Sequence, residues 1–229
     1  MPIDMELEQV LRPHQYEMKP YPEKFITLAN GKTMVVRQAQ REDVPEILKS
    51  VHPCLFIERD YYDIVSARLY GELLAWYRHR VKSAYCIMGQ VDGYLVGIVN
   101  GRMETEKQGM SYHTLAIDRG LRIGSHLFAA KMEYHMEYLE QDEVLIVAES
   151  PIGFRRWMIE YPLIPSKIPH ELGGGDSWIL TRETYYKAKP RLVVGERPVP
   201  EDLMVEARAE IKYADEETIR ERIAGLKGT

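Results

Sequence analysis

A turn rich in arginine and glycine joins a predicted strand, residues 112–117, to a predicted helix that starts at Ser125. The first N–H groups of a helix have no intrahelical acceptors, and they point outward beside the positive end of the helix dipole. That arrangement suits a pyrophosphate, and glycine lets phosphate oxygens come close to the backbone. The sequence therefore predicts a phosphate-binding turn at residues 118–125. A plain strand-to-helix turn with a surface arginine pair is the alternative.

Two side chains near this turn have acid–base chemistry. Glu149 follows the apolar run 144–148, which is typical of a strand buried on both faces. Ligands of α/β proteins gather at the carboxyl ends of such strands, so Glu149 is a candidate general base. His113 shares strand parity with Leu115 and Ile117, and it is predicted to face inward. We keep His113 as a second candidate base, with a buried, hydrogen-bonded histidine as the alternative.

The elements that position these groups follow from local patterns. Asn30-Gly31 and Asp92-Gly93 lie between apolar strand patterns and predict two hairpins. Asp43 is predicted to cap one helix, and Ser150 is predicted to cap another that starts at Pro151. The full prediction is strands at 25–29, 33–37, 85–91, 94–101, 112–117, 144–148 and 177–183, and helices from 43, over 62–80, over 125–140 and over 151–161.

Two stretches of the chain resemble the GCN5-related N-acetyltransferase (GNAT) family. Residues 26–39 with Asp43 resemble its opening, and residues 113–125 resemble its acyl-CoA pyrophosphate segment, Gln/Arg-x-x-Gly-x-Gly/Ala. Arg119 and Gly124 match the ends of that pattern, whereas Arg122 stands where the family has its middle glycine. The resemblance covers roughly residues 25–187. It implies an α/β fold of the α+β type, with a mixed, mostly antiparallel central sheet flanked by helices.

The resemblance also implies the ligand and the reaction. Acetyl-CoA or another acyl-CoA would be the substrate, held largely by backbone N–H groups of the turn. The strands that carry Ile117 and Val147 would splay apart, and a primary amine would attack the thioester directly, with no covalent enzyme intermediate. The residues expected to contact the acyl-CoA are Ala116, Ile117, Arg119, Gly120, Leu121, Arg122, Ile123, Gly124 and Ser125.

The family often uses a tyrosine to protonate the departing thiolate. Trp157 falls near that place in this chain, and an indole N–H does not titrate. Tyr161 lies one turn further along and is the candidate acid in a shifted alignment. A pair of core aromatic residues on an amphipathic helix is the alternative.

Composition excludes several other classes of protein. The 229 residues carry a formal net charge of −5, which argues against broad nucleic-acid binding. No apolar run approaches the roughly 18 residues of a membrane span, and the first eight residues hold three acids and no base, unlike a secretory leader. Two cysteines and scattered histidines indicate no metal site. We expect a cytoplasmic protein that binds neither membrane nor nucleic acid; the sequence is also compatible with a homodimer.

Three segments are predicted: an N-terminal arm at 1–24, the acyltransferase-like domain at 25–187, and a linker with a helical extension at 188–229. The extension is expected to pack back on the domain through apolar residues at helical spacing, namely Leu203, Ile211, Ile219, Ile223 and Leu226. Two other hypotheses stay open. The chain is either an acyl-CoA-binding or partner-binding protein that keeps the fold without the chemistry, or an assembly protein that uses its two arms.

Overall fold

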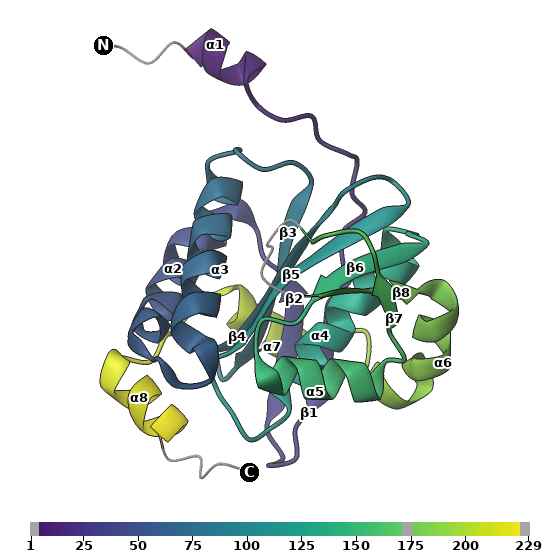
Figure 1. Cartoon of the computed structure of the whole chain (residues 1–229). Helices are drawn as coiled ribbons and strands as arrows, with labels where there is room; N and C mark the ends of the chain where they lie inside the picture. Colours follow the sequence, from purple (N-terminus) through teal and green to yellow (C-terminus); the bar gives the residue numbers. More distant parts are fainter. Residues whose placement is uncertain (1–4, 171–175, 225–229) are drawn as a thin grey trace.

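A central eight-stranded sheet organises the computed structural model, which describes residues 5–170 and 176–224 (Figure 1). The strand order is β1-β2-β3-β4-β5-β6-β8-β7, and every neighbouring pair is antiparallel except β5 and β6. This is the mixed, mostly antiparallel sheet that the sequence predicts. The strands are β1 (Lys24–Thr27), β2 (Thr33–Gln38), β3 (Ala84–Val91), β4 (Tyr94–Met103), β5 (Gln108–Ala116), β6 (Glu143–Val147), β7 (Ile164–Ser166) and β8 (Ser177–Thr181).

Helices cover both faces of the sheet (Figure 1). On one face, α2 and α3 bury residues such as Ile47, Leu69 and Leu73 against β3, β4 and β5. On the other face, α4 packs against β1 to β4 and joins α5 and α6 over β6 and β8. The helices are α1 (Met5–Val10), α2 (Val44–Val51), α3 (Tyr62–Tyr77), α4 (Ile123–Glu133), α5 (Pro151–Glu160), α6 (Arg182–Leu192), α7 (Glu201–Arg208) and α8 (Glu216–Ala224).

Both predicted hairpins form. Asp92 and Gly93 have φ of 52° and 76°, the two positive values that a tight two-residue hairpin turn requires. In the other hairpin only Gly31 has a positive φ, 81°, and the Leu28 N–H closes the turn on the Lys32 carbonyl at 2.8 Å. These turns are local in the sequence, and their pattern was enough to place them.

The sheet opens between β5 and β6. Val99 pairs with Thr114 but Gly101 pairs with Ser111, so β5 holds one residue more than β4 between these pairs and forms a bulge. The parallel pairing of β5 with β6 ends at Ser111 and Ile146, while β5 continues to Ala116. The two strands therefore part where the bulge begins, which is the splay that the sequence interpretation expects.

Helix α6 is not anticipated by the sequence interpretation, which places a strand end at 183 and a linker from 188. Its start is fixed by Thr181, whose Oγ1 accepts the Thr184 N–H at 3.3 Å while the Thr184 hydroxyl accepts the Thr181 N–H at 3.0 Å. Pro190 lies in the last turn of α6 and has no N–H to donate to the helix, which ends two residues later at Leu192. The helix crosses residue 187, and the domain boundaries at 24 and 187 stay predictions.

Two predicted helix starts differ in detail. Asp43 stands at the N-cap of α2, but its carboxylate makes no capping bond there. It accepts the Gln40 N–H at 2.8 Å and pairs with the Arg37 guanidinium at 2.7 Å, because the charged partner outcompetes the helix N–H groups. Helix α4 begins at Ile123 rather than at Ser125, and it continues as a π-helical turn at Tyr134–Tyr138.

The C-terminal extension packs on the domain through part of the predicted set. Ile211 and Ile219 are buried in the core formed by α2 and α3, as expected. Leu203 is half-buried, and the side chains of Ile223 and Leu226 lie outside the described residues. In the described part of the chain, none of the helices has the length and apolar character to cross a bilayer.

Candidate active site

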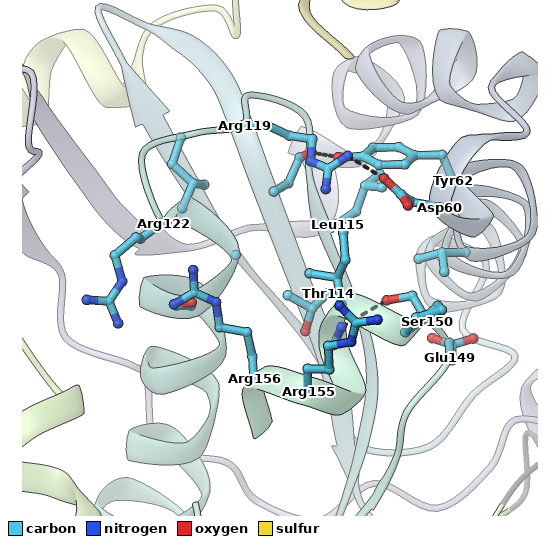
Figure 2. Close-up of a pocket in the computed structure, with 18 of the residues that line it drawn as sticks. Asp60, Tyr62, Thr114, Leu115, Arg119, Arg122, Glu149, Ser150, Arg155 and Arg156 are labelled. Carbon is cyan, nitrogen blue, oxygen red and sulfur yellow. Dashed lines mark hydrogen bonds and ion pairs between the residues drawn. The ribbon is translucent and has the colours of Figure 1, made fainter. Parts of the chain in front are cut away.

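A cleft of about 760 Å³ opens where β5 and β6 part (Figure 2). Its walls are residues 59–60 before α3, the first turn of α3, the end of β5, the turn that follows β5, and the first turns of α4 and α5. Five arginines and three carboxylates line it: Arg59, Arg119, Arg122, Arg155, Arg156, Asp60, Asp118 and Glu149. The cleft therefore brings the predicted phosphate turn and the predicted acid–base residue together.

The turn before α4 contains two residues in the left-handed region of the backbone. Gly120 has φ 90°, and Arg122, the N-cap of α4, has φ 61° and ψ 20°. This left-handed conformation costs about 1–2 kcal/mol for a residue with a Cβ and costs glycine almost nothing. Arg122, which stands at the middle glycine of the family pattern, thus adopts a conformation that glycine adopts more easily. The N–H groups of Ile123, Gly124 and Ser125 belong to the first helical turn, and these residues line the cleft.

We expect Arg122→Gly to stabilise the fold by up to about 1 kcal/mol, because it removes the left-handed strain. The gain is partly offset by loss of the exposed ion pair between Arg122 Nη2 and Glu160 Oε1 at 3.1 Å. Arg122→Ala loses the same ion pair and keeps the strain, so it is the matched control. Urea unfolding should rank Gly above Ala; the reverse order would contradict the strained-turn interpretation.

A second helix starts at the same cleft. Ser150 is extended, with φ −136° and ψ 153°, and its Oγ accepts the Gly153 N–H at 3.1 Å, so it caps α5 as predicted. Pro151 occupies the first helical position, where its missing N–H costs nothing. The positive ends of α4 and α5 therefore both face the cleft.

Most residues predicted to contact acyl-CoA line this cleft, namely Ala116, Arg119, Gly120, Arg122, Ile123, Gly124 and Ser125. Two do not. Ile117 is buried in the core beneath α3, and Leu121 packs against the core beneath α4. The turn runs between the two cores, so its apolar residues point into them and its glycines and polar residues face the cleft.

The Arg119 side chain is engaged on the α3 side of the cleft (Figure 2). Its Nη1 pairs with Asp60 Oδ2 at 2.7 Å, and its guanidinium lies 5.6 Å from the centre of the Tyr62 ring. The Tyr62 hydroxyl donates to the Ala116 carbonyl at 2.6 Å. Asp60 and Tyr61 both have positive φ, 55° and 62°. These contacts fasten a strained segment to the phosphate turn.

Glu149 lines the cleft and forms a buried pair with His113, which is not among the described lining residues. His113 Nδ1 lies 2.6 Å from Glu149 Oε2 and donates its proton to that carboxylate, while Glu149 Oε1 accepts from Arg68 Nη1 at 2.9 Å. Burial by itself raises the pKa of Glu149, but the hydrogen bonds and charges of His113 and Arg68 together bring that pKa below its usual 4.5. His113 is fully buried, and its Nε2 has no hydrogen-bond partner among the described residues.

The bulge in β5 explains this pairing. At the bulge, Tyr112 and His113 of β5 face the single residue Asn100 of β4, and their rings stack with centres 6.0 Å apart. The His113 backbone N–H donates to Asn100 Oδ1 at 3.0 Å. The histidine thus faces inward, as predicted, but it meets a carboxylate from the neighbouring strand end. The pair joins residues 36 positions apart in the chain, which no local pattern could connect.

Trp157 lines the cleft, whereas the described lining residues do not include Tyr161. Trp157 stacks on the Phe128 ring with ring centres 4.4 Å apart. Tyr161 packs edge-on against the Phe128 ring, with centres 5.4 Å apart. Tyr161 is almost fully buried, burial raises the pKa of its hydroxyl, and that hydroxyl has no partner in the described structure. The part of Tyr161 as an acid stays a prediction.

Lys131 is a buried base that the sequence interpretation missed. It lies on α4 with no exposed surface, and its Nζ donates to the carbonyls of Tyr112 and His113 at 3.3 and 3.1 Å and to Thr114 Oγ1 at 3.3 Å. Burial lowers the pKa of Lys131 from 10.5 to about 7, although the negative charge of Glu149 acts to raise it. Its helix sequence gives no warning, because the groups that accept its hydrogen bonds belong to β5, a different element.

Stability should depend on pH through Lys131. Between pH 7 and 10 the unfolded chain holds a proton on this lysine that the folded chain lacks, so the free energy of unfolding rises with pH. The slope reaches up to about 1.4 kcal/mol per pH unit for one proton. Lys131→Met should therefore remove part of the rise measured by urea unfolding at pH 7, 8 and 9. Parallel curves for parent and variant would show that Lys131 titrates equally in both states.

Neither cysteine is suited to act as a nucleophile. Cys54 and Cys86 are buried, and burial raises the pKa of each thiol to about 12. A thiolate is therefore scarce at neutral pH. Glu149 and the backbone N–H groups of the α4 start are the candidate functional groups that line the cleft.

Comparisons with known proteins place the fold. No family model and no curated protein matches the sequence. An uncharacterized protein from Bacillus halodurans superposes with a TM-score of 0.53 at 11% identity, covering 74% of this chain and 95% of that chain. The GNAT domain of S. lividans PAT superposes with a TM-score of 0.53 at 11% identity, covering 72% and 99%. The chain therefore has the fold of the GCN5-related N-acetyltransferases, in a version strongly divergent in sequence.

Proposed function

We propose that this protein transfers an acyl group from an acyl-CoA, with acetyl-CoA as the first candidate, to a primary amine. One observation carries the proposal. A single cleft at the parting of β5 and β6 is lined by two helix starts with a glycine-containing turn and by Glu149, a carboxylate that pairs with the buried His113 imidazole. The first set suits a pyrophosphate, and the second suits an amine that must lose protons.

The phosphate end works mainly through the backbone. The pyrophosphate would accept from the N–H groups of residues 123–125, which the start of α4 leaves without helical acceptors. The positive end of the α4 dipole adds to this attraction. Side chains contribute less here, because the Arg119 guanidinium is held by Asp60.

The acid–base end would receive the amine. Glu149 stays ionised at neutral pH because its pKa is lowered, so it attracts an ammonium group. The ammonium gives up one proton to the Glu149–His113 pair and becomes a nucleophile. Its nitrogen then forms the C–N bond as the C–S bond breaks, and the second amine proton neutralises the CoA thiolate. Alignment of the two reactants supplies much of the rate, roughly 7–11 kcal/mol in favourable cases.

Two measurements on the full chain test the proposal. Calorimetry with CoA, acetyl-CoA, propionyl-CoA and longer acyl-CoA thioesters measures binding, and a thiol-release assay with a panel of primary amines measures transfer. We expect one acyl-CoA to bind and to release CoA only when an amine is present. Absence of binding by every thioester would overturn the proposal.

One observation favours a second candidate, an acyl-CoA-binding protein without turnover. The position near the family's tyrosine holds Trp157, which has no titrating group, and Tyr161 is buried beside Phe128 rather than in the cleft lining of the described structure. This candidate predicts binding in calorimetry and no thiol release with any amine. The same two assays therefore separate the candidates.

A further inference from the structure

Three arginines, Arg122, Arg155 and Arg156, gather on the side of the cleft formed by α5 and the phosphate turn, and we call them the arginine rim (Figure 2). Arg122 Nη2 and Arg156 Nη1 share one carboxylate oxygen of Glu160, at 3.1 and 3.2 Å. In the described part of the chain, the Arg155 side chain makes no ion pair and no hydrogen bond. Three positive charges thus meet one negative charge, which leaves an excess of two.

The arginine rim is accessible from the cleft. The Arg122 and Arg156 side chains are 55% and 45% exposed, and Arg155 is exposed as well. Arg119 lies on the opposite side, paired with Asp60, so it adds no charge to this rim. Holding several guanidinium groups together in water is unfavourable unless an anion neutralises them, and Glu160 neutralises only one.

The structure assigns the arginine rim, we propose, to the 3′-phosphate of the CoA ribose. This inference rests on the proposed function, because it names the part of acyl-CoA that the rim recognises. A phosphomonoester carries a charge of about −1.5 to −2 at pH 7 and three strong acceptor oxygens. That charge matches the excess of the rim, and guanidinium forks suit phosphate geometry.

The position of the rim favours a phosphate of CoA over an anionic acceptor. Arg122 is the N-cap of α4, so the rim begins directly beside the backbone donors assigned to the pyrophosphate. The acceptor is expected at Glu149, which pairs with Arg68 of α3 rather than with any rim residue. A protein with this rim should prefer free acyl-CoA to thioesters that lack the 3′-phosphate, such as dephospho-CoA derivatives.

The test compares CoA with dephospho-CoA by calorimetry, in the parent and in the Arg155→Ala/Arg156→Ala variant. We expect the parent to bind CoA about tenfold or more tightly than dephospho-CoA. In the double variant this preference should fall to within about threefold, with the affinity for dephospho-CoA little changed. Higher salt should reduce the preference of the parent, because the rim is exposed.

The matched control is Arg78→Ala/Arg80→Ala, which removes the same charge from two exposed arginines outside the cleft lining. It should keep the preference for CoA. Equal affinity of the parent for CoA and dephospho-CoA would overturn the inference while leaving acyl-CoA binding intact. A rise in the KM of the amine in the double variant, with the CoA preference kept, would assign the rim to the acceptor and also overturn it. If the parent binds neither form, the proposed function itself fails.

Discussion

Glu149→Gln is expected to lower the turnover number about 100-fold or more while leaving the affinity for acyl-CoA within about threefold. In the proposed reaction the carboxylate both attracts the ammonium and receives its proton, and the amide keeps its shape without either property. Acyl-CoA should bind as before, because the proposal assigns its phosphates to backbone N–H groups at the start of α4. Thiol release at saturating acyl-CoA measures the turnover, and calorimetry measures the affinity.

Glu143→Gln is the matched control for this experiment. Glu143 begins β6, the strand that ends just before Glu149, and its Oε1 accepts from Gln108 Nε2 at 2.6 Å at the far end of the strand from the cleft. The control should change turnover less than twofold. Equal turnover of the Glu149 variant and the parent would remove Glu149 from the proposed chemistry.

His113 should act through Glu149 as a positioning residue. Its hydrogen bond and charge help to lower the Glu149 pKa, so His113→Phe should raise that pKa and move the acid limb of the pH–rate profile upward. A purely structural loss would lower the rate at every pH without moving the limb.

The Glu149 carboxylate also affects the stability of the fold. Its pKa is lower in the folded chain than in the unfolded chain, so its ionised form stabilises the fold above the pKa of the unfolded state. That stabilisation is lost as the pH falls through the pKa of the folded state.

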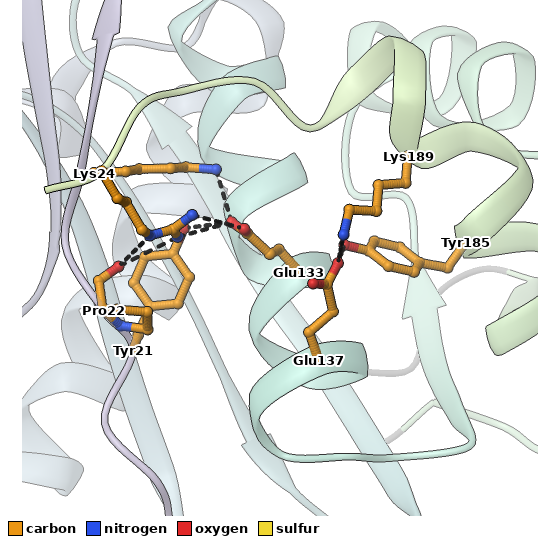
Figure 3. A network of polar contacts seen from close by, with 8 residues as sticks. Tyr21, Pro22, Lys24, Glu133, Glu137, Tyr185 and Lys189 are labelled. Carbon is orange, nitrogen blue, oxygen red and sulfur yellow. Dashed lines mark hydrogen bonds and ion pairs between the residues drawn. The ribbon is translucent and has the colours of Figure 1, made fainter.

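Glu133→Gln is expected to destabilise the fold by about 3–5 kcal/mol, because it breaks a buried ion-pair network (Figure 3). Glu133 lies on α4 and accepts from Lys24 Nζ at 2.7 Å, from the Tyr21 hydroxyl at 2.7 Å and from Arg197 Nη1 at 3.1 Å. Lys24 is almost fully buried, so it would remain as an uncompensated charge. Urea unfolding at pH 7 measures the loss.

Glu137→Gln, one turn further along, provides the comparison. Glu137 pairs with Lys189 at 2.7 Å and accepts from the Tyr185 hydroxyl, but it is more exposed than Glu133 (Figure 3). Solvent screens such a pair, so the control should cost about 1 kcal/mol or less. If both variants lose the same free energy of unfolding, burial does not determine how much the Glu133 network stabilises the fold.

The Glu133 network also fixes both arms of the chain. Tyr21 precedes β1, and Lys24 is the first residue of β1. Arg197 belongs to the segment that follows α6. All three contact Glu133 of α4, the helix whose first turn lines the cleft. The stability of this helix therefore depends on residues that lie at both ends of the sequence, far from the turn itself.

The sequence determined the features that depend on neighbouring residues. Asp92-Gly93 favours a tight turn because both residues adopt positive φ. Ser150-Pro151 favours a helix start because the serine can cap the helix and the proline that follows it suits the first helical position. The order of strand, turn and helix over residues 112–140 followed from local patterns of the same kind. Arg122 was identified as the departure from the family pattern, and the left-handed backbone found there is a local property of the turn.

The tertiary structure decided everything that joins distant residues. A bulge in β5 turns His113 toward Glu149, and the packing of α4 beneath that bulge buries Lys131 without a counter-ion in contact. Glu160 gathers Arg122 and Arg156 from different elements, and Glu133 gathers both arms. Charge, burial and pKa depend on what surrounds a side chain in space. A single sequence without its three-dimensional packing specifies the residue types available for chemistry, and only the folded sheet determines which of them meet.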